Sequence, residues 1–158
     1  MRVTALYALA VAALLSAPVP VRADFLLGMS VTNELVGPTF EWAGDASSTY
    51  LALGAYQGNT GYDVENLTGY IGHRRYVGGD FHKRSFYGDF FLGDLGGGPT
   101  FNRFGAGGAV GHQWLTENLR VYVAAGVVVL GEASGTGGPT STDPEPQSIL
   151  GAGASIRY

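Results

Sequence analysis

Apolar and polar residues alternate with a period of two along most of the chain after residue 24, and no segment there keeps an apolar stripe at helical spacing. Such alternation predicts β-strands, and clusters of Gly, Pro, Asn and Asp mark the breaks between them. The pattern predicts eight strands: Phe25–Thr32, Thr39–Ala43, Ser48–Gln57, Leu67–Tyr76, Arg84–Gly93, Phe101–Leu115, Leu119–Gly131 and Ser148–Tyr158. We therefore expect an all-β fold.

The two faces of these strands differ in a consistent way. In Phe101–Leu115 one face carries Phe104, Val110 and Trp114, whereas the other carries Arg103, a row of small residues and Gln113. The later strands repeat the contrast between an uncharged face and a face of small residues with isolated polar groups. Lipid outside and a narrow, filled interior would produce this contrast. The fold class expected is an eight-stranded antiparallel up-and-down transmembrane β-barrel.

The connections between the predicted strands alternate in length. The odd ones, 33–38, 58–66, 94–100 and 132–147, are on average longer than the even ones, 44–47, 77–83 and 116–118. Bacterial outer-membrane barrels have short turns at the periplasmic end and longer loops outside the cell. We therefore expect both termini at the periplasmic end. The segment 132–147, rich in Gly, Ser, Thr and Pro, is the expected contact loop for an extracellular ligand.

The first 23 residues are predicted to be a secretory signal peptide, because Arg2 precedes an apolar run and Ala23 is a small residue at the expected cleavage point. The apolar run is shorter than the roughly 20 residues of a membrane-spanning helix. Residues 24–158 then form one barrel domain. The chain has no cysteine, which excludes a lipid-anchored cysteine and a disulfide framework. The expected location is the bacterial outer membrane.

Composition narrows the possible partners. Without Arg2 and Arg22, seven basic residues face thirteen acidic ones, and no basic run remains, so no nucleic-acid partner is expected. All 26 glycines lie after residue 23, and together with many Tyr and Phe they are typical of a sheet that curves and closes. We expect a monomer surrounded by outer-membrane lipid, with no metal and no cofactor.

Isolated charges within the strands are candidates for interior ion pairs, because a charge inside a narrow barrel is costly unless it is paired. Charges of this kind are Glu41, Arg74, Arg75, Asp89, Arg103, Arg120 and Arg157. The interior ion-pair candidates among them are Glu41, Asp89, Arg103 and Arg120, and Asp89 is expected to join Arg103 in one network. Such a network would fill the lumen and hold the strand register. Three aromatic residues near predicted strand ends, Trp42, Tyr76 and Trp114, are expected at the membrane–water interface.

The last strand ends in LGAGASIRY, with Leu150, Ala152, Ala154, Ile156 and the terminal Tyr158 alternating. In this ending, and in its strand rhythm from residue 24 on, the chain resembles small bacterial outer-membrane β-barrel proteins. The stretches HRRYVGG, SFYGDFFLGDLGG, FGAGGAVGHQWL and LRVYVAAGVV are similar to a family of such barrels with no assigned activity. The resemblance implies that the five alternating residues of the last strand, from Leu150 to Tyr158, are recognised by the barrel-assembly machinery. The function expected from the sequence as a whole is a non-enzymatic role in surface structure, adhesion or envelope integrity.

Two alternatives stay open. A soluble lipocalin-like barrel, with its apolar face turned inward around a small apolar ligand, also has eight strands, but its outer face would need more polar residues than this chain offers. An envelope lipid-modifying hydrolase is less favoured. None of His73, His82 and His112 has a serine two residues later, as a lipid deacylase barrel requires. The set His82, Ser85 and Asp89, which would suit a palmitate transferase, falls at the periplasmic end of the predicted topology.

Overall fold

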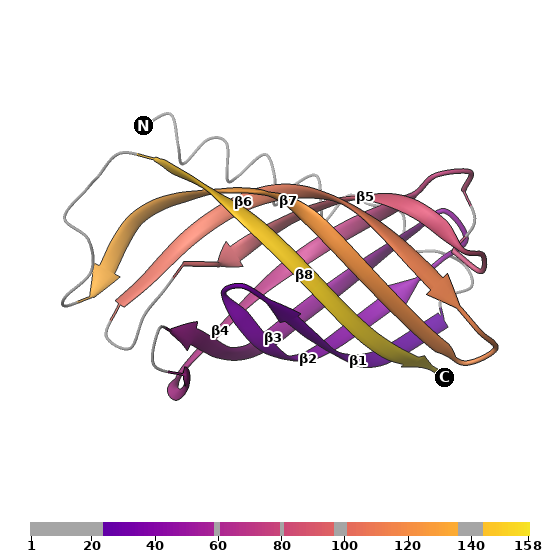
Figure 1. The fold of residues 1–158 in the computed structure, drawn as a ribbon, viewed down its shortest axis with the longest axis horizontal. Coiled ribbons are helices and arrows are strands. Elements are labelled where there is room, and N and C mark those ends of the chain that lie inside the picture. Colours follow the sequence, from indigo (N-terminus) through magenta and orange to yellow (C-terminus); the bar gives the residue numbers. More distant parts are fainter. Residues whose placement is uncertain (1–23, 59–60, 80, 97–100, 136–143) are drawn as a thin grey trace.

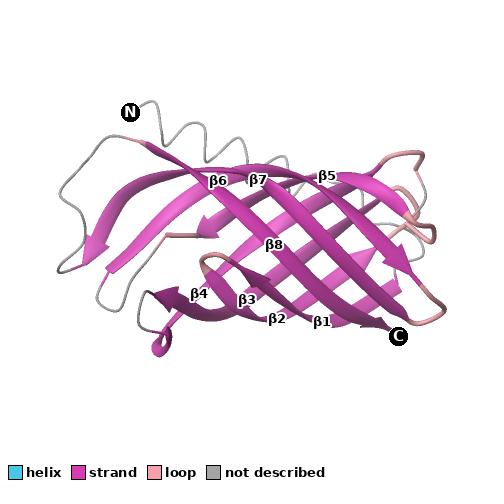
Figure 2. Ribbon diagram, in the orientation of Figure 1, coloured by secondary structure: helices cyan, strands magenta, loops and turns pink. Residues whose placement is uncertain are grey.

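A computed structural model describes residues 24–58, 61–79, 81–96, 101–135 and 144–158. They form eight strands: β1 (Asp24–Thr32), β2 (Leu35–Ala43), β3 (Ser47–Gly58), β4 (Gly61–Tyr76), β5 (Ser85–Asp94), β6 (Phe101–Leu115), β7 (Leu119–Gly135) and β8 (Glu145–Arg157). Each strand pairs with the next, and β8 pairs with β1, so the sheet closes into an antiparallel barrel (Figure 1). The predicted all-β barrel with eight strands is confirmed. No helix in the described residues is long and apolar enough to cross a membrane (Figure 2).

The two ends of the barrel are defined by the chain termini. The terminal end holds the start of β1, the end of β8 and the connections 44–46, 77–84 and 116–118, and the distal end is opposite. At the distal end β6 and β7 extend well past the turn that joins β1 and β2 (Figure 1). The barrel wall is therefore taller on the β6–β7 side than on the β1–β2 side.

The second strand is longer than predicted. It begins at Leu35, so the first connection is only residues 33–34, and Pro38 lies inside β2 opposite Met29 of β1. Proline lacks the amide hydrogen that a central strand donates, which is why the sequence indicates a loop there. The structure accommodates Pro38 because the β2–β3 pairing passes from Val36–Ala55 to Thr39–Ala52 and leaves the positions between unpaired.

The expected contrast in connection length is wrong for the first two odd connections, which shrink to residues 33–34 and 59–60. Strands β7 and β8 also run past their predicted ends, so the expected contact loop 132–147 contains strand residues at both of its ends, and its middle, 136–143, lies outside the described residues. The sequence-predicted signal peptide, 1–23, lies outside them too. The strands continue into segments whose composition is typical of turns, because pairing with the neighbouring strands provides backbone hydrogen bonds there: β6 pairs with the end of β7, and β7 pairs with the start of β8.

Side chains divide between the two faces as the alternation predicts. On the outer face, large apolar side chains are exposed on all eight strands, among them Met29, Trp42, Leu53, Ile71, Phe90, Val110, Val127 and Leu150. Inside, one buried apolar cluster around Tyr76, Phe81, Tyr87 and Tyr122 fills the terminal end, and another around Tyr70, Phe91 and Leu130 fills the distal end. The four charged candidates, Glu41, Asp89, Arg103 and Arg120, also have buried side chains.

Phe81, which lies in the connection between β4 and β5, closes the terminal end from within. Phe81 is fully buried inside the barrel, where its ring contacts Tyr76, and its amide donates a hydrogen bond to the carbonyl of Asp45. The side-chain amide of Gln113 donates to the carbonyl oxygens of Phe81, at 2.8 Å, and Lys83, at 3.2 Å. The side chain of Phe81 is therefore a plug tied to the wall, whereas the sequence indicates only a short turn at this end of the barrel.

Candidate functional site

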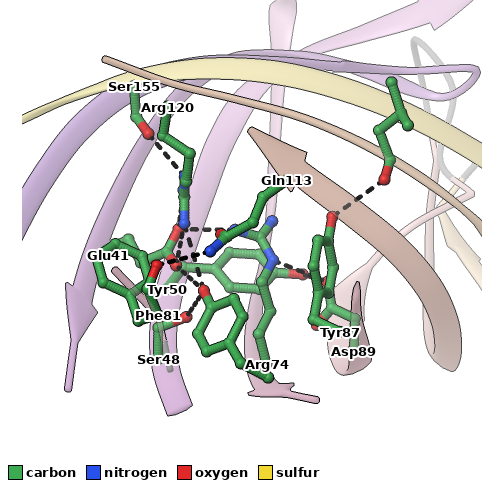
Figure 3. A network of polar contacts seen from close by, with 12 residues as sticks. Glu41, Ser48, Tyr50, Arg74, Phe81, Tyr87, Asp89, Gln113, Arg120 and Ser155 are labelled. Atoms are coloured by element: carbon green, nitrogen blue, oxygen red, sulfur yellow. Dashed lines mark hydrogen bonds and ion pairs between the residues drawn. The ribbon is translucent and has the colours of Figure 1, made fainter. Parts of the chain in front are cut away.

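Four charged residues from four different strands meet inside the barrel (Figure 3). Glu41 of β2, Arg74 of β4, Asp89 of β5 and Arg120 of β7 all point inward, and their side chains are at most 5% exposed. The two carboxylates and two guanidinium groups give the layer no net charge. We call these four residues the ion-pair layer.

Glu41 is the centre of the ion-pair layer. Its Oε2 accepts a hydrogen bond of 2.7 Å from Nη1 of Arg74, and its Oε1 accepts one of 2.7 Å from Nη1 of Arg120. Arg120 also donates from Nη2 to Oε2, so the Arg120–Glu41 pair has two contacts. Such two-point contacts fix the relative orientation of the groups as well as attracting them. Glu41 therefore ties β2 to both β4 and β7 across the lumen.

Arg74 connects the two carboxylates. Its Nε donates to Oδ2 of Asp89 at 3.2 Å, and its guanidinium lies over the rings of Tyr50, at 4.2 Å, and Tyr122, at 4.4 Å. A cation held against aromatic faces gains further electrostatic stabilisation where water is excluded. The hydroxyl of Tyr50 donates to the same oxygen of Asp89 at 3.0 Å.

Neutral polar groups complete the layer at its edges. The hydroxyl of Tyr76 donates to Glu41 at 3.2 Å and lies 2.8 Å from the hydroxyl of Ser48. Figure 3 shows Arg120 between Glu41 and Ser155, and Nε of Arg120 donates to the Ser155 hydroxyl at 3.1 Å. Burying a charge without partners costs several kcal/mol, and these contacts offset that cost.

The ion-pair layer also limits the space inside the barrel. A cavity beside it, bordered by Ser30, Tyr50 and Asp89, has a volume of about 30 Å³. A space of that size holds about one water molecule. The two carboxylates and the two guanidinium groups bind one another. This arrangement therefore supports non-covalent bridging of strands β2, β4, β5 and β7 through the lumen.

The structure brings together three of the four predicted ion-pair residues and leaves out the fourth. Asp89 lies opposite Ala109 of β6, whereas Arg103 lies further along β6 toward the distal end, so the expected Asp89–Arg103 pair is wrong. Arg103 instead accompanies Asp94: its amide donates to Oδ1 of Asp94 at 3.0 Å, and its Nε donates to the carbonyl of Gly131 at 3.0 Å. Knowing that the two strands are adjacent was not enough to predict the ion pair, because the register determines which residues lie at the same height along the barrel.

The sequence marked Arg74 as an isolated charge but did not place it among the interior ion-pair candidates. The dipeptide Arg74–Arg75 offers one inward and one outward arginine, and the alternation of Tyr70, Gly72, Arg74 and Tyr76 is the signal that would have chosen Arg74. Arg75 is exposed on the outer face.

The predicted interfacial aromatics divide into two groups. Trp42 and Trp114 are outward-facing near the terminal end, with 47% and 41% of their surface exposed. Tyr76 is 3% exposed and belongs to the interior, so its assignment to the interface is wrong. Its position at the end of β4 suggested the interface, but it shares the inward face with Arg74 and hydrogen-bonds to Glu41.

The predicted assembly residues lie on the outer face of β8 or at its end. Leu150, Ile156 and Tyr158 are exposed, Ala154 is exposed and Ala152 is half-buried. The amide of Tyr158 donates to the carbonyl of Phe25 at 2.9 Å, so the backbone of the last residue still joins the first strand.

No cluster of three or more His, Asp or Glu side chains in the described ranges is arranged to hold a metal ion. Comparison with known proteins gives no further guide: no family model, no curated protein and no solved structure matches this chain.

Proposed function

We propose that this chain is a non-enzymatic bacterial outer-membrane β-barrel with a filled lumen, acting in surface structure, adhesion or envelope integrity. The observation that carries the proposal is the inverted distribution of polarity. Exposed large apolar side chains cover the outer face of all eight strands, while Glu41, Arg74, Asp89 and Arg120 are buried inside. Apolar outside and polar inside is the arrangement of a barrel in lipid.

The aromatic residues at the terminal end support the same proposal. Phe25 and Trp42 are in ring contact at 5.7 Å on one side of the barrel, and His112 and Trp114 are in contact at 4.4 Å on the other. Arg84 lies over the ring of Trp114. Aromatic and basic groups of this kind favour the headgroup region of a membrane. The resemblance of the sequence to small outer-membrane barrels, with the barrel-assembly machinery as their partner, belongs to this proposal.

A soluble lipocalin-like barrel is the competing proposal. A lysine introduced on the outer face by substitution would distinguish the two. Met29 lies in the middle of β1, 54% exposed. In lipid, Met29→Lys places a charge near the bilayer centre and should destabilise the folded barrel by about 2–4 kcal/mol. In water, the same exposed substitution should change the stability by at most about 0.5 kcal/mol. The measurement is denaturant unfolding of the full chain in lipid vesicles.

Asn118→Lys provides the matched control, because Asn118 is exposed in the 116–118 connection, outside the strands. It should be close to neutral in both cases. Cell fractionation is the second measurement: the protein is expected in the membrane fraction and to migrate differently on a denaturing gel before and after heating. A soluble periplasmic protein whose stability is unaffected by Met29→Lys would refute the membrane proposal.

A further inference from the structure

An apolar groove with a basic residue at one end crosses the outer face of β4, β5, β6 and β7. Its volume is about 560 Å³, and its lining includes Arg75, Gly88, Phe90, Gly108, Val110 and Ala125. The groove exists because small residues alternate with large ones across the strands. A side-chain carbon added at Gly88 would meet no atom within 4 Å, so the space above it is open.

The register shows how the groove is oriented. Arg75 lies opposite Gly88, Gly88 opposite Val110, and Val110 opposite Ala125, so the four form one row across four strands. Arg75 is the next-to-last residue of β4 at the terminal end, whereas Val110 and Ala125 lie in the inner parts of β6 and β7. The row therefore runs obliquely from the rim of the barrel into the apolar band.

The charge lies where a lipid headgroup would lie. Arg75 is exposed, and across the described residues its guanidinium has no hydrogen bond or ion pair. Its neighbours on the outer face include His73, on the same strand, Ser47, opposite it on β3, and Gly88, which has no side chain to cover it. A long basic side chain at the edge of an apolar band extends its charge toward the headgroups. Apart from Arg75 and His73, and from Asp89, whose side chain points into the lumen, the lining consists of Gly, Ala, Val and Phe.

On this basis, and resting on the proposed membrane location, we infer that the groove binds one anionic phospholipid of the leaflet at the terminal end. The phosphate lies against Arg75, and one acyl chain follows the row over Gly88 toward Gly108 and Ala125. The two ends of the groove match the two parts of such a lipid: a cation for the phosphate and an uncharged channel for the hydrocarbon. Neither feature alone would select this ligand.

Quenching of tryptophan fluorescence by brominated acyl chains tests the inference. Both native tryptophans are replaced by phenylalanine, and one reporter is introduced at a time. Phe90→Trp places the reporter in the groove, and Phe40→Trp places it on β2, at the opposite side of the barrel. Each full-length protein is folded into phosphatidylcholine vesicles that contain a small fraction of phosphatidylglycerol with brominated chains.

Selective binding should enrich phosphatidylglycerol at the groove about fivefold over the bulk fraction, the ratio that corresponds to about 1 kcal/mol for one basic residue at an anionic surface. The Phe90→Trp reporter is therefore expected to be quenched more strongly than the Phe40→Trp reporter. Arg75→Gln should remove most of this difference. Gly88→Leu, which fills the open space of the groove, should remove it as well.

Arg157→Gln is the control for charge, because Arg157 is a basic residue at the same rim on β8. It should leave the difference intact. Equal quenching of the two reporters by brominated phosphatidylglycerol, or a difference that survives both Arg75→Gln and Gly88→Leu, would overturn the inference. Cross-linking that shows Gly88→Leu to break up a dimer would also overturn it, because the occupant would then be a second copy.

Failure of the proposed function gives a different result. If the barrel is not in the membrane, brominated phosphatidylcholine as the bulk lipid quenches neither reporter. If the barrel is in the membrane and the groove has no preference, bulk brominated phosphatidylcholine quenches both, and brominated phosphatidylglycerol quenches both equally.

Discussion

At the scale of single residues, Glu41 is the residue that forms ion pairs with both arginines of the ion-pair layer. It is almost completely buried and faces two arginines, Arg74 and Arg120, which come from strands on different sides of the lumen. Removing one member of a buried charge group leaves the others without compensation, and this effect exceeds the net value of the intact pair. Arg74 keeps Asp89 as a second partner, whereas within the described part of the chain Arg120 has only neutral partners besides Glu41.

Glu41→Gln is therefore expected to lower the free energy of unfolding by about 3–5 kcal/mol. The measurement is the denaturant midpoint of the protein folded in detergent or vesicles. Glu117→Gln, at an exposed position in the 116–118 connection, removes the same charge and should change stability by at most about 0.5 kcal/mol. Equal midpoints for Glu41→Gln and the unsubstituted protein would show that the ion-pair layer contributes nothing to stability.

At the scale of elements, a tyrosine ring lies against a glycine of the next strand in three of the described strand pairs. Tyr50 of β3 lies opposite Gly72, Tyr87 of β5 opposite Gly111, and Tyr122 of β7 opposite Gly153. In each case a side-chain carbon on the glycine would overlap the tyrosine ring. The ring thus lies flat against the backbone of the neighbouring strand, which leaves room in the lumen for the arginines. Glycine is required here for close approach.

Gly111→Ala should therefore destabilise the barrel by about 1–3 kcal/mol, the usual effect of forcing extra volume into a packed interior. Gly88→Ala is the matched control, because Gly88 belongs to a neighbouring strand but faces open space. It should leave stability nearly unchanged. Thermal unfolding followed by circular dichroism compares the two variants. If the Gly111→Ala variant were as stable as the Gly88→Ala variant, the Tyr87 ring could move away from the added methyl group without any loss of stability.

At the scale of the whole molecule, the pairing of β8 with β1 closes the barrel. The register joins Arg157 to Leu26 and Gly151 to Thr32, and the backbone of Tyr158 adds one more hydrogen bond to Phe25. The side chain of Tyr158 is 73% exposed, so it contributes little to the packing of the folded barrel. A role before folding, as part of a signal that the assembly machinery reads, is what we propose for it.

Tyr158→Ala is expected to reduce the amount of folded barrel in the membranes of cells, while the purified chain should still refold into detergent with nearly unchanged stability. The substitution keeps the backbone hydrogen bond and removes only the exposed ring. Tyr158→Phe, which keeps an aromatic ring, should assemble normally. Normal assembly of Tyr158→Ala would rule out an assembly role, and a parallel loss of stability in detergent would point to a structural role instead.

The sequence alone was enough to predict the strands, their number and the direction in which most side chains point. This information is local, because a residue's face depends only on its position along a strand with a period of two. Both ends of β6 and the start of β7 were therefore predicted, and the inward positions of Glu41, Asp89 and Arg120 are seen in the structure. The start of β2 was missed because Pro38 is a local signal for a loop.

Tertiary structure decided which inward residues meet. Asp89 binds Arg74 and not Arg103 because the register of β5 with β6 places Arg103 at another level of the barrel. Tyr76 is interior, and Phe81 enters the lumen from a connection, because the closed barrel leaves space at the terminal end that these rings fill. The groove that begins at Arg75 likewise depends on the register of four strands, because only that register places its small residues side by side. Alternation along one strand determines a side chain's face, whereas its partner depends on how the strands are aligned, a property that appears only when the sheet closes.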